Sequence, residues 1–192
     1  MTGLRQEKGL LVVPSQQQEA QDRAIEPRAL RDVCGLFVTG VTVITSGDGE
    51  GVVGATVNSF TSVSLDPPMV LFCLHRDSRI REVVRESNGF VVNFLTGRQE
   101  SLAWAFAGRR TASFEGVAHH HSERGMPVLS EALAYLSCRL VNEFDGGDHT
   151  IFLGEVVDLG EPRRNHDPLI FFRGSMGALE DEPKAFHPIM DG

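Results

Sequence analysis

Two short glycine-rich segments, each placed between runs of β-branched and aromatic residues, constrain the fold of this chain more than any other feature. They lie at residues 47–51 and 145–148. Glycine tolerates the positive φ angles of tight hairpin turns, so each segment predicts a pair of antiparallel strands. The strands predicted in this way are Val41–Ser46 with Val52–Val57, and Ala134–Phe144 with Thr150–Leu159. The fold therefore contains at least two β-hairpins.

Three more short apolar runs predict strands. They are Met69–Leu74, which we expect to be buried, Phe90–Leu95 and Leu169–Phe172. Asp66-Pro67-Pro68 precedes the first of them and favours extended backbone, because a proline restricts the residue before it. We interpret residues 59–68 as a polar loop and residues 108–127 as irregular.

Three segments show helical patterns. Pro27 is typical of a first helical residue, and Gly40 ends the segment that follows it. The apolar residues between them, at the spacing of one buried face, are Leu30, Val33, Cys34 and Phe37. Asp77 or Ser78 can cap a second helix, and Asn88-Gly89 supplies its left-handed stop. Its inward residues are Ile80, Val83 and Val84. Residues 98–107 predict a third helix on the surface.

Strands that follow one another without regular alternation with helices favour an antiparallel barrel decorated by helices. Gly49 and Gly51 raise a dinucleotide-binding fold as the alternative. That fingerprint requires a helix after the glycine loop, whereas this loop opens into a strand pattern. With 192 residues the chain favours one domain, preceded by a flexible extension over residues 1–26.

The charge balance and the lengths of the apolar segments limit the classes of partner that this chain can bind. Eighteen basic and 26 acidic residues give a net charge of -8 with no basic stripe, which argues against a nucleic-acid partner. Leu10–Val13 is too short for a signal-peptide core, and no segment reaches the length of a membrane span. We therefore expect a soluble, cytoplasmic protein without membrane contact.

The cysteines, Cys34, Cys73 and Cys138, form no Cys-x-x-Cys pair, and we expect them to be reduced and buried.

The motifs favour neither a serine hydrolase nor a metal centre. Residues 174–177 contain Ser175 but lack the spacing of a nucleophile elbow. The run His119-His120-His121 can supply metal ligands, but consecutive histidines in an extended loop point in different directions. No nearby carboxylate pattern completes a site, so a solvated loop is the preferred interpretation and we expect no metal.

Three polar segments at strand ends can bind a ligand, and each also has a purely structural interpretation. Asp148-His149 places an imidazole at a strand mouth or satisfies a turn. Ser78-Arg79 can bind a phosphate or be an ordinary cap and an exposed arginine. Residues 54–59 combine a glycine with amide and hydroxyl groups, which suit a planar heterocycle such as a flavin or mark a polar strand end.

Six blocks of sequence, taken in their order and spacing, resemble the flavin reductase family of two-component flavin-dependent monooxygenases. The blocks are Phe37–Thr45, Thr56–Pro68, Leu71–Leu74 with Ser78-Arg79, Phe90–Leu95, Gly147–His149 with Gly154–Val156, and Pro168–Gly174. The resemblance covers Pro27 to Gly177. It implies a mainly β fold, the antiparallel Greek-key split β-barrel of the FMN-binding type with flanking helices. It also implies a domain over residues 27–177 and a tail over 178–192.

The resemblance further implies an NAD(P)H:flavin oxidoreductase. Such an enzyme takes NADH or NADPH, reduces FAD or FMN, and releases the reduced flavin to a separate oxygenase, and the family is homodimeric. The flavin-binding residues implied are Val53, Gly54, Ala55, Thr56, Asn58, Ser59, Cys73, Leu74, Ser78, Arg79, Ala107 and Gly108, the stretch from Cys73 to Arg79 lying towards the phosphate. His149 and Phe172, Arg173 and Gly174 would border the nicotinamide. Hydride transfer is the cofactors' own chemistry, so no catalytic acid or base is required.

The chain departs from the family pattern at two places. Ser113-Phe114 stands where the family commonly has Lys-Phe, and Met176 stands where an aromatic residue is common. Two other functions are compatible with the same barrel. One is a non-catalytic flavin-binding protein, and the other is an enzyme like pyridoxamine-phosphate oxidase, which oxidises its substrate with O2 and uses no nicotinamide.

Overall fold

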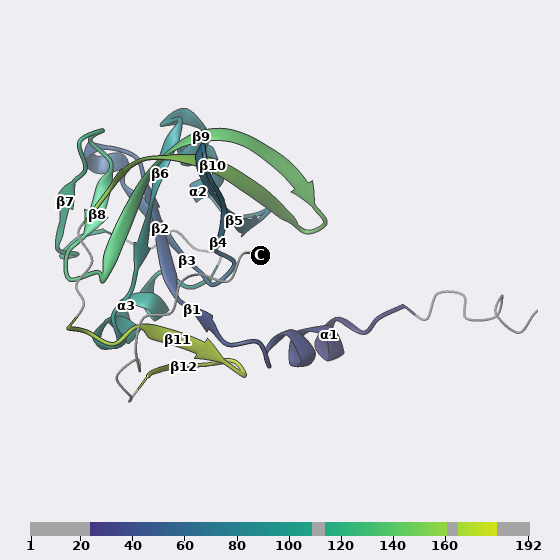
Figure 1. The fold of residues 1–192 in the computed structure, drawn as a ribbon. Helices are drawn as coiled ribbons and strands as arrows, with labels where there is room; N and C mark the ends of the chain where they lie inside the picture. Colours follow the sequence, from purple (N-terminus) through teal and green to yellow (C-terminus); the bar gives the residue numbers. More distant parts are fainter. Residues whose placement is uncertain (1–23, 109–113, 161–164, 180–192) are drawn as a thin grey trace, which may run out of the picture. The chain divides into compact units, whose positions relative to one another are not determined.

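The computed structural model describes residues 24–108, 114–160 and 165–179 (Figure 1). The chain divides into two compact units, residues 1–34 and 35–192. In the first unit, α1 spans Pro27–Cys34 and none of its residues is buried. The prediction of a longer helix with a buried face was therefore wrong. Gly35, a residue type at which helices end, follows directly, and the chain is extended again in β1 (Thr39–Gly40).

The second unit is built around a seven-stranded antiparallel sheet in the order β3-β2-β6-β9-β10-β5-β4. Its strands are β2 (Thr42–Ser46), β3 (Val53–Val57), β4 (Thr61–Leu65), β5 (Pro68–His75), β6 (Gly89–Phe94), β9 (Ala134–Gly146) and β10 (His149–Leu159). Both predicted hairpins are confirmed, because β2 pairs with β3 and β9 pairs with β10. Figure 1 shows the β9–β10 hairpin curving past the other strands.

The interior of the barrel is filled by the inward-facing residues of these strands. Along β5, buried Val70, Phe72 and Leu74 alternate with half-buried outward residues, as a strand with one face in a core requires. The prediction that this strand is buried thus holds for one face only. Phe72 packs edge to face on Phe90 and stacks on Phe152, with ring centroids 4.8 and 5.3 Å apart.

The segment after β3 closes the barrel. Because β3 and β4 are the two edges of the sheet, the chain must cross from one edge to the other through residues 58–60. The Ser59 hydroxyl fixes this crossover by accepting a hydrogen bond from the Cys73 N–H (2.9 Å) and donating one to its carbonyl (3.2 Å). The polar loop predicted for residues 59–68 was wrong from Thr61 onwards, since β4 pairs with β5. As an exposed edge strand, β4 lacks the alternation that marks a half-buried one.

Two smaller sheets flank the barrel. One has the order β1-β11-β12, with β11 at Leu169–Phe172 and β12 at Ser175–Ala178, so the prediction of a strand at 169–172 is confirmed. The other pairs β7 (His119–His121) with β8 (Pro127–Leu129). The irregular structure predicted for residues 108–127 was therefore wrong at the histidine run. A second apolar cluster lies between the barrel and these layers: Val41, Val43, Leu95, Ala103, Phe106, Leu129 and Leu169.

Two helices of the second unit were predicted correctly in outline. Helix α2 spans Ile80–Glu86 and buries Ile80 and Val84, and Asn88 has the predicted left-handed backbone, with φ of 48°. Arg79 occupies its N-cap position, so the prediction of a Ser78 or Asp77 cap was wrong. Residues 98–107 contain the end of a 3₁₀ turn, Gly97–Gln99, and α3 (Glu100–Ala105). A second 3₁₀ turn, Gly49–Gly51, lies between β2 and β3.

The structure tests the expectations that the cysteines are reduced and buried and that no helix spans a membrane. All three thiols are free, but only Cys138 is buried, whereas Cys73 is half-buried and Cys34 is exposed. The expectation of burial was wrong for Cys34 because α1 buries no residue. None of the helices in the described part of the chain has the length and apolar content needed to cross a lipid bilayer.

Candidate functional site

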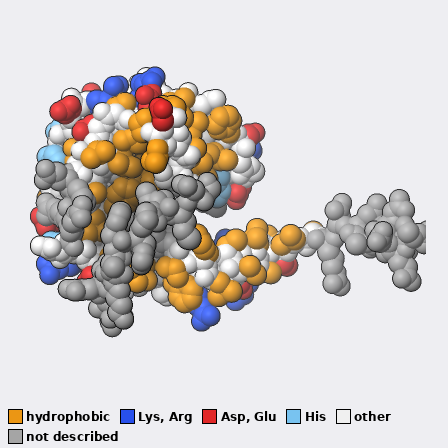
Figure 2. Space-filling view, viewed as in Figure 1, with side chains coloured by type: hydrophobic (Ala, Val, Ile, Leu, Met, Phe, Trp, Pro, Cys, Tyr) orange, Lys and Arg blue, Asp and Glu red, His pale blue; other side chains and the backbone are white. Residues whose placement is uncertain are grey.

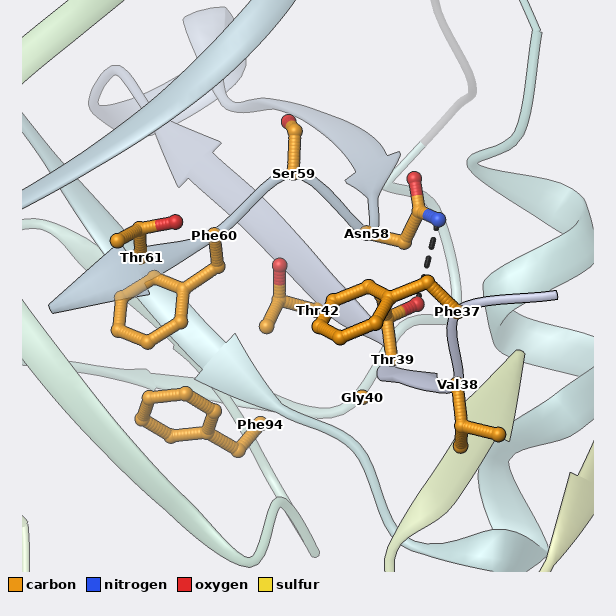
Figure 3. Close-up of a pocket in the computed structure, with 10 residues that line it drawn as sticks. All are labelled: Phe37, Val38, Thr39, Gly40, Thr42, Asn58, Ser59, Phe60, Thr61 and Phe94. Carbon is orange, nitrogen blue, oxygen red and sulfur yellow. Dashed lines mark hydrogen bonds between the residues drawn. The ribbon is translucent and has the colours of Figure 1, made fainter. Parts of the chain in front are cut away.

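The crossover between β3 and β4 lines part of a pocket with a volume of about 500 Å³ (Figure 3). It is lined by Phe37, Val38, Thr39, Gly40, Thr42, Asn58, Ser59, Phe60, Thr61 and Phe94. Figure 3 shows the rings of Phe60 and Phe94 on one side of this group of side chains. They pack edge to face, with centroids 5.0 Å apart. The pocket thus combines aromatic walls with hydroxyl and amide groups.

A second, smaller pocket is also bordered by Asn58. Its volume is about 220 Å³, and it is lined by Val41, Thr56, Val57, Asn58, Trp104, Ala107, Phe171 and Met176. Asn58 is the residue that the two pockets share. Its side-chain amide donates a hydrogen bond of 3.2 Å to the Thr39 hydroxyl, as Figure 3 shows. The pair Asn58–Thr39 therefore places polar groups between two largely apolar surfaces.

Only part of the predicted β3 segment faces these pockets. Thr56 lines the smaller pocket, but its hydroxyl donates to the Ala103 carbonyl (2.6 Å) and its N–H donates to the Phe106 carbonyl (3.0 Å). Ala55 belongs to the barrel core and Val53 packs against it. These contacts attach α3 to the barrel, so Thr56 supports the pocket wall.

The glycine at position 54 is explained by its packing against aromatic side chains of this chain. A Cβ at this position would lie 2.9 Å from the Phe106 ring and 3.1 Å from Phe114. Such distances are shorter than ordinary van der Waals contact, so a side chain here would displace the aromatic pair. The space beside Gly54 is therefore occupied by Phe106 of this chain.

The residues predicted to lie towards a phosphate follow one another along the end of β5. Cys73 is joined to the crossover by Ser59, and burial raises the pKa of its thiol, an effect that the Ser59 hydrogen bond partly opposes. Leu74 is buried in the barrel core and can offer only its backbone to a ligand. Ser78 is half-buried and Arg79 is exposed after the turn. The structure thus brings Ser59 and Cys73 together, with Arg79 further along.

His149 lies beside the same strand. It pairs with His75 across β10 and β5, and the two imidazole rings meet edge to face with centroids 5.4 Å apart. Its Nδ1 lies 2.7 Å from the Asp148 carboxylate, and this hydrogen bond lowers the pKa of Asp148. A carboxylate can only accept, so Nδ1 carries the proton and Nε2 faces away from Asp148. The local turn therefore orients the ring and leaves its other nitrogen for a ligand.

The remaining predicted residues lie around the smaller pocket and the outer sheet. Arg173 and Gly174, with φ of 51° and 81°, form a two-residue turn between β11 and β12. The Arg173 guanidinium lies 5.0 Å from the centre of the Phe172 ring, and the backbone N–H of Arg173 donates to the Gly35 carbonyl (2.9 Å). Ala107 lines the smaller pocket. Gly108, with φ of 105°, is exposed and ends the described part of this loop.

Comparison with known proteins assigns a family to this arrangement. Residues 34–180 match the model of the flavin reductase like domain. The chain belongs to the flavin reductase like family. This membership confirms the resemblance drawn from the six sequence blocks and the split-barrel fold that it implied.

Three relatives of this flavin reductase like chain illustrate the match. It is 39% identical over 159 residues to the reductase subunit HsaB of a flavin-dependent monooxygenase from Mycobacterium tuberculosis, covering 82% of this chain and 85% of that protein. This chain is 35% identical to nitrilotriacetate monooxygenase component B from Mycobacterium thermoresistibile, and its structure matches the crystal structure of that protein with a TM-score of 0.77. The match covers 86% of this chain and 94% of that one. The NADH:FAD oxidoreductase SgcE6 from Streptomyces globisporus, in complex with NAD and FAD fragments, shares 36% identity, with a TM-score of 0.73, covering 88% and 100% of the two chains.

Sequence reasoning missed several residues of the pockets in this flavin reductase like domain. They are Phe37, Val38, Thr39, Thr42, Phe60, Phe94, Trp104 and, beside His149, His75. The block Phe37–Thr45 signalled the family, but its first residues were assigned to a helix because of their apolar spacing. Of the two departures from the family pattern, Met176 lines the smaller pocket, and Ser113 lies outside the described residues.

Proposed function

We propose that this chain is an NAD(P)H-dependent flavin reductase. It transfers hydride from a nicotinamide to free FAD or FMN and supplies the reduced flavin to a partner monooxygenase. The observation that carries the proposal is the meeting of two apolar pockets at the polar Asn58–Thr39 pair, in a chain of the flavin reductase like family. The reductase subunit HsaB and SgcE6 with its NAD and FAD fragments support both the activity and the cofactors.

The donor set fits a flavin. An isoalloxazine is planar, apolar on its faces and rich in hydrogen-bonding groups along its edge, and the pockets offer aromatic walls with amide and hydroxyl groups between them. Bound flavin supplies the hydride-accepting ring, so the chain must hold two rings in contact and exclude water. Asn58 and Thr39 would meet the ring edge, and Trp104 and Met176 would cover an apolar face.

The two ends of the ligand would meet different groups. The exposed Arg79 guanidinium would hold the flavin phosphate, because a guanidinium pairs with phosphate through two parallel hydrogen bonds. His149, oriented by Asp148, would contact the nicotinamide through Nε2. Neutral hydrogen bonds each contribute only about 0.5 to 1.5 kcal/mol, which suits a flavin that must leave again.

We further propose a homodimer in the cytoplasm, where reduced nicotinamide and a partner oxygenase are available. The support for a dimer is the edge strand β4, whose outer side chains Val63 and Leu65 are 48% and 81% exposed. Unpaired edges with exposed large apolar groups are typical interaction surfaces. Light scattering should give a mass of about twice the 21.0 kDa of one chain, and a mass equal to one chain would contradict the dimer.

The activity is tested by mixing the protein with excess FAD or FMN, adding NADH or NADPH, and following the absorbance of reduced nicotinamide in air. We expect many turnovers with at least one of the four combinations, and the fastest combination identifies the preferred pair. Bound flavin without nicotinamide consumption in any combination would favour the non-catalytic flavin-binding protein. Oxidation of pyridoxamine phosphate by O2 would favour the other alternative.

A matched pair of variants tests the site itself. Asn58→Ala should weaken flavin binding, because it removes the polar group shared by both pockets. Ser62→Ala is the control, since Ser62 is exposed on β4 and lines neither pocket. Equal flavin affinity in the two variants would show that the flavin binds elsewhere.

A further inference from the structure

The histidine run lies on a short strand that is fixed to the barrel. Strand β7 contains the three histidines and pairs with β8, with His119 opposite Leu129 and His121 opposite Pro127. The β8 strand is itself attached through the buried Asn93, whose side-chain carbonyl accepts a hydrogen bond of 2.8 Å from the Leu129 N–H. The histidines are therefore presented by a regular, anchored hairpin and not by the irregular loop that the sequence suggested.

A strand separates the three side chains by face. Successive residues of a strand point to opposite sides, so His119 and His121 share one face and His120 lies on the other. The rings of His119 and His121 are 5.7 Å apart between centroids, whereas His120 lies 6.1 Å from the Tyr135 ring. Two imidazoles that bind one tetrahedral ion, with metal–nitrogen bonds of about 2.0 to 2.1 Å, have centroids roughly 5 Å apart. A small side-chain rotation thus brings His119 and His121 to that spacing.

A backbone hydrogen bond already orients one of these rings for coordination. The Nδ1 atom of His119 lies 2.8 Å from the Val117 carbonyl oxygen. A carbonyl only accepts, so Nδ1 carries the proton and Nε2 keeps its lone pair. Histidines that bind metals commonly donate their second ring N–H to a carbonyl or carboxylate in this way. All three histidines of the strand are exposed, and Figure 2 shows histidine side chains at the edge of the view where Figure 1 places β7.

We propose that His119 and His121 chelate a divalent transition-metal ion. Two imidazole nitrogens favour Cu²⁺, Ni²⁺ and Zn²⁺ over the oxygen-seeking Mg²⁺ and Ca²⁺, and Cu²⁺ should bind most tightly. Within the described residues, no group of three or more His, Cys, Asp and Glu side chains is placed to hold an ion. Water therefore completes the coordination, and the site is open and reversible, unlike a closed structural zinc site.

The test uses the full chain without an affinity tag, with CuCl2 and NiCl2 as probes in titration calorimetry and retention on immobilised Ni²⁺ as a second measurement. We expect one ion per chain. His119→Asn and His121→Asn should each weaken metal binding by about 100-fold. Two histidines held in one chain bind an ion more tightly than a single histidine by about that factor. Both residues are exposed, so the variants should fold, which thermal melting checks.

Two control variants make the result specific. His120→Asn should bind as the original chain does, because its ring lies on the other face of the strand. His149→Asn disrupts the His75–His149 pair, the second close histidine pair among the described residues, and should also leave metal binding unchanged. Absence of binding, equal loss with His120→Asn, or loss only with His149→Asn would overturn the proposal. None of these measurements depends on flavin reduction, so failure of the proposed enzyme activity remains distinguishable.

Discussion

The two faces of β5 and β10 differ in what their residues do, although the strands are shared. The inward residues Phe72, Leu74 and Phe152 are almost completely buried in one apolar cluster. The outward residues Cys73 and His149 lie among hydroxyl, imidazole and carboxylate groups. We therefore expect stability to depend on the inward positions and the proposed ligand contact on the outward ones, so a change at one face should leave the other largely intact.

This separation follows from the pleat of the strand. A ligand that approaches from outside meets every second residue of β5, while the residues between them hold the barrel in shape. The Ser59 crossover belongs to the outer set, because it bonds to the backbone of Cys73 at the rim. Mutations can therefore test whether stability and binding are indeed carried by alternate residues.

The largest effect should come from the inward face. Phe72→Ala removes a ring with 0% exposure that packs on two other phenylalanines, and should lower the free energy of unfolding by about 3 to 5 kcal/mol. Cys73→Ala, one residue away, should cost under about 1 kcal/mol because its half-buried thiol fills little of the core. Urea unfolding of both variants measures the contrast. Similar losses at the two positions would break the distinction between the faces.

The next effect concerns ligand affinity at the outer end of β5. Arg79→Ala should weaken flavin binding by about 1.5 to 3 kcal/mol, the contribution of a hydrogen bond to a charged group, while leaving stability nearly unchanged. Arg85→Ala is the matched control, since Arg85 lies outside the Cys73–Arg79 stretch, is exposed and pairs with Glu143 at 2.8 Å. Flavin titration by fluorescence gives both affinities. Unaltered affinity in Arg79→Ala would place the phosphate elsewhere.

The inward face was largely predictable from the sequence, and much of the outward face was not. Hairpins follow from glycine-rich turns between β-branched runs, and the resemblance to the family supplied the barrel topology. Leu74 and Ala55 show the limit of transferring site residues by segment. The family resemblance assigned both residues to the flavin site, yet both belong to the buried core cluster. A matching segment does not by itself show which of its side chains face the core.

The pocket residues missed by the sequence reasoning share a physical cause. Thr39 gains its place from pairing between β1 and β11, which are about 130 residues apart in the chain and close only in the fold, and Phe37 lies just before β1. The Asn58–Thr39 hydrogen bond likewise joins two separate segments. Local periodicity reports only near neighbours, so it assigned Phe37 to a helix that ends at Cys34.

The barrel core should also respond to alkaline solution through Cys138, which lies on β9. Burial raises the pKa of the inward Cys138 thiol from 9.0 to about 12. In the unfolded chain the thiol ionises above pH 9, so this site contributes its full stability below pH 9 and loses about 1.4 kcal/mol per pH unit above it, up to the folded pKa. Cys138→Ala should remove that slope, measured as the difference in unfolding free energy from the original chain between pH 8 and pH 10. An equal slope in the variant would assign it to other groups.

The smallest effect tests whether the outward face distinguishes the two ligands of the proposed reaction. His149→Ala should raise KM for NADH by the equivalent of about 0.5 to 1.5 kcal/mol, one neutral hydrogen bond, because the ring that Asp148 orients is lost. Flavin affinity should stay the same, since the flavin is held by Asn58 and Arg79 in this proposal. The control His120→Ala removes an exposed imidazole on β7. Steady-state kinetics with flavin titration separates the outcomes: unchanged kinetics removes His149 from the site, and an equal loss of flavin affinity places its ring against the flavin.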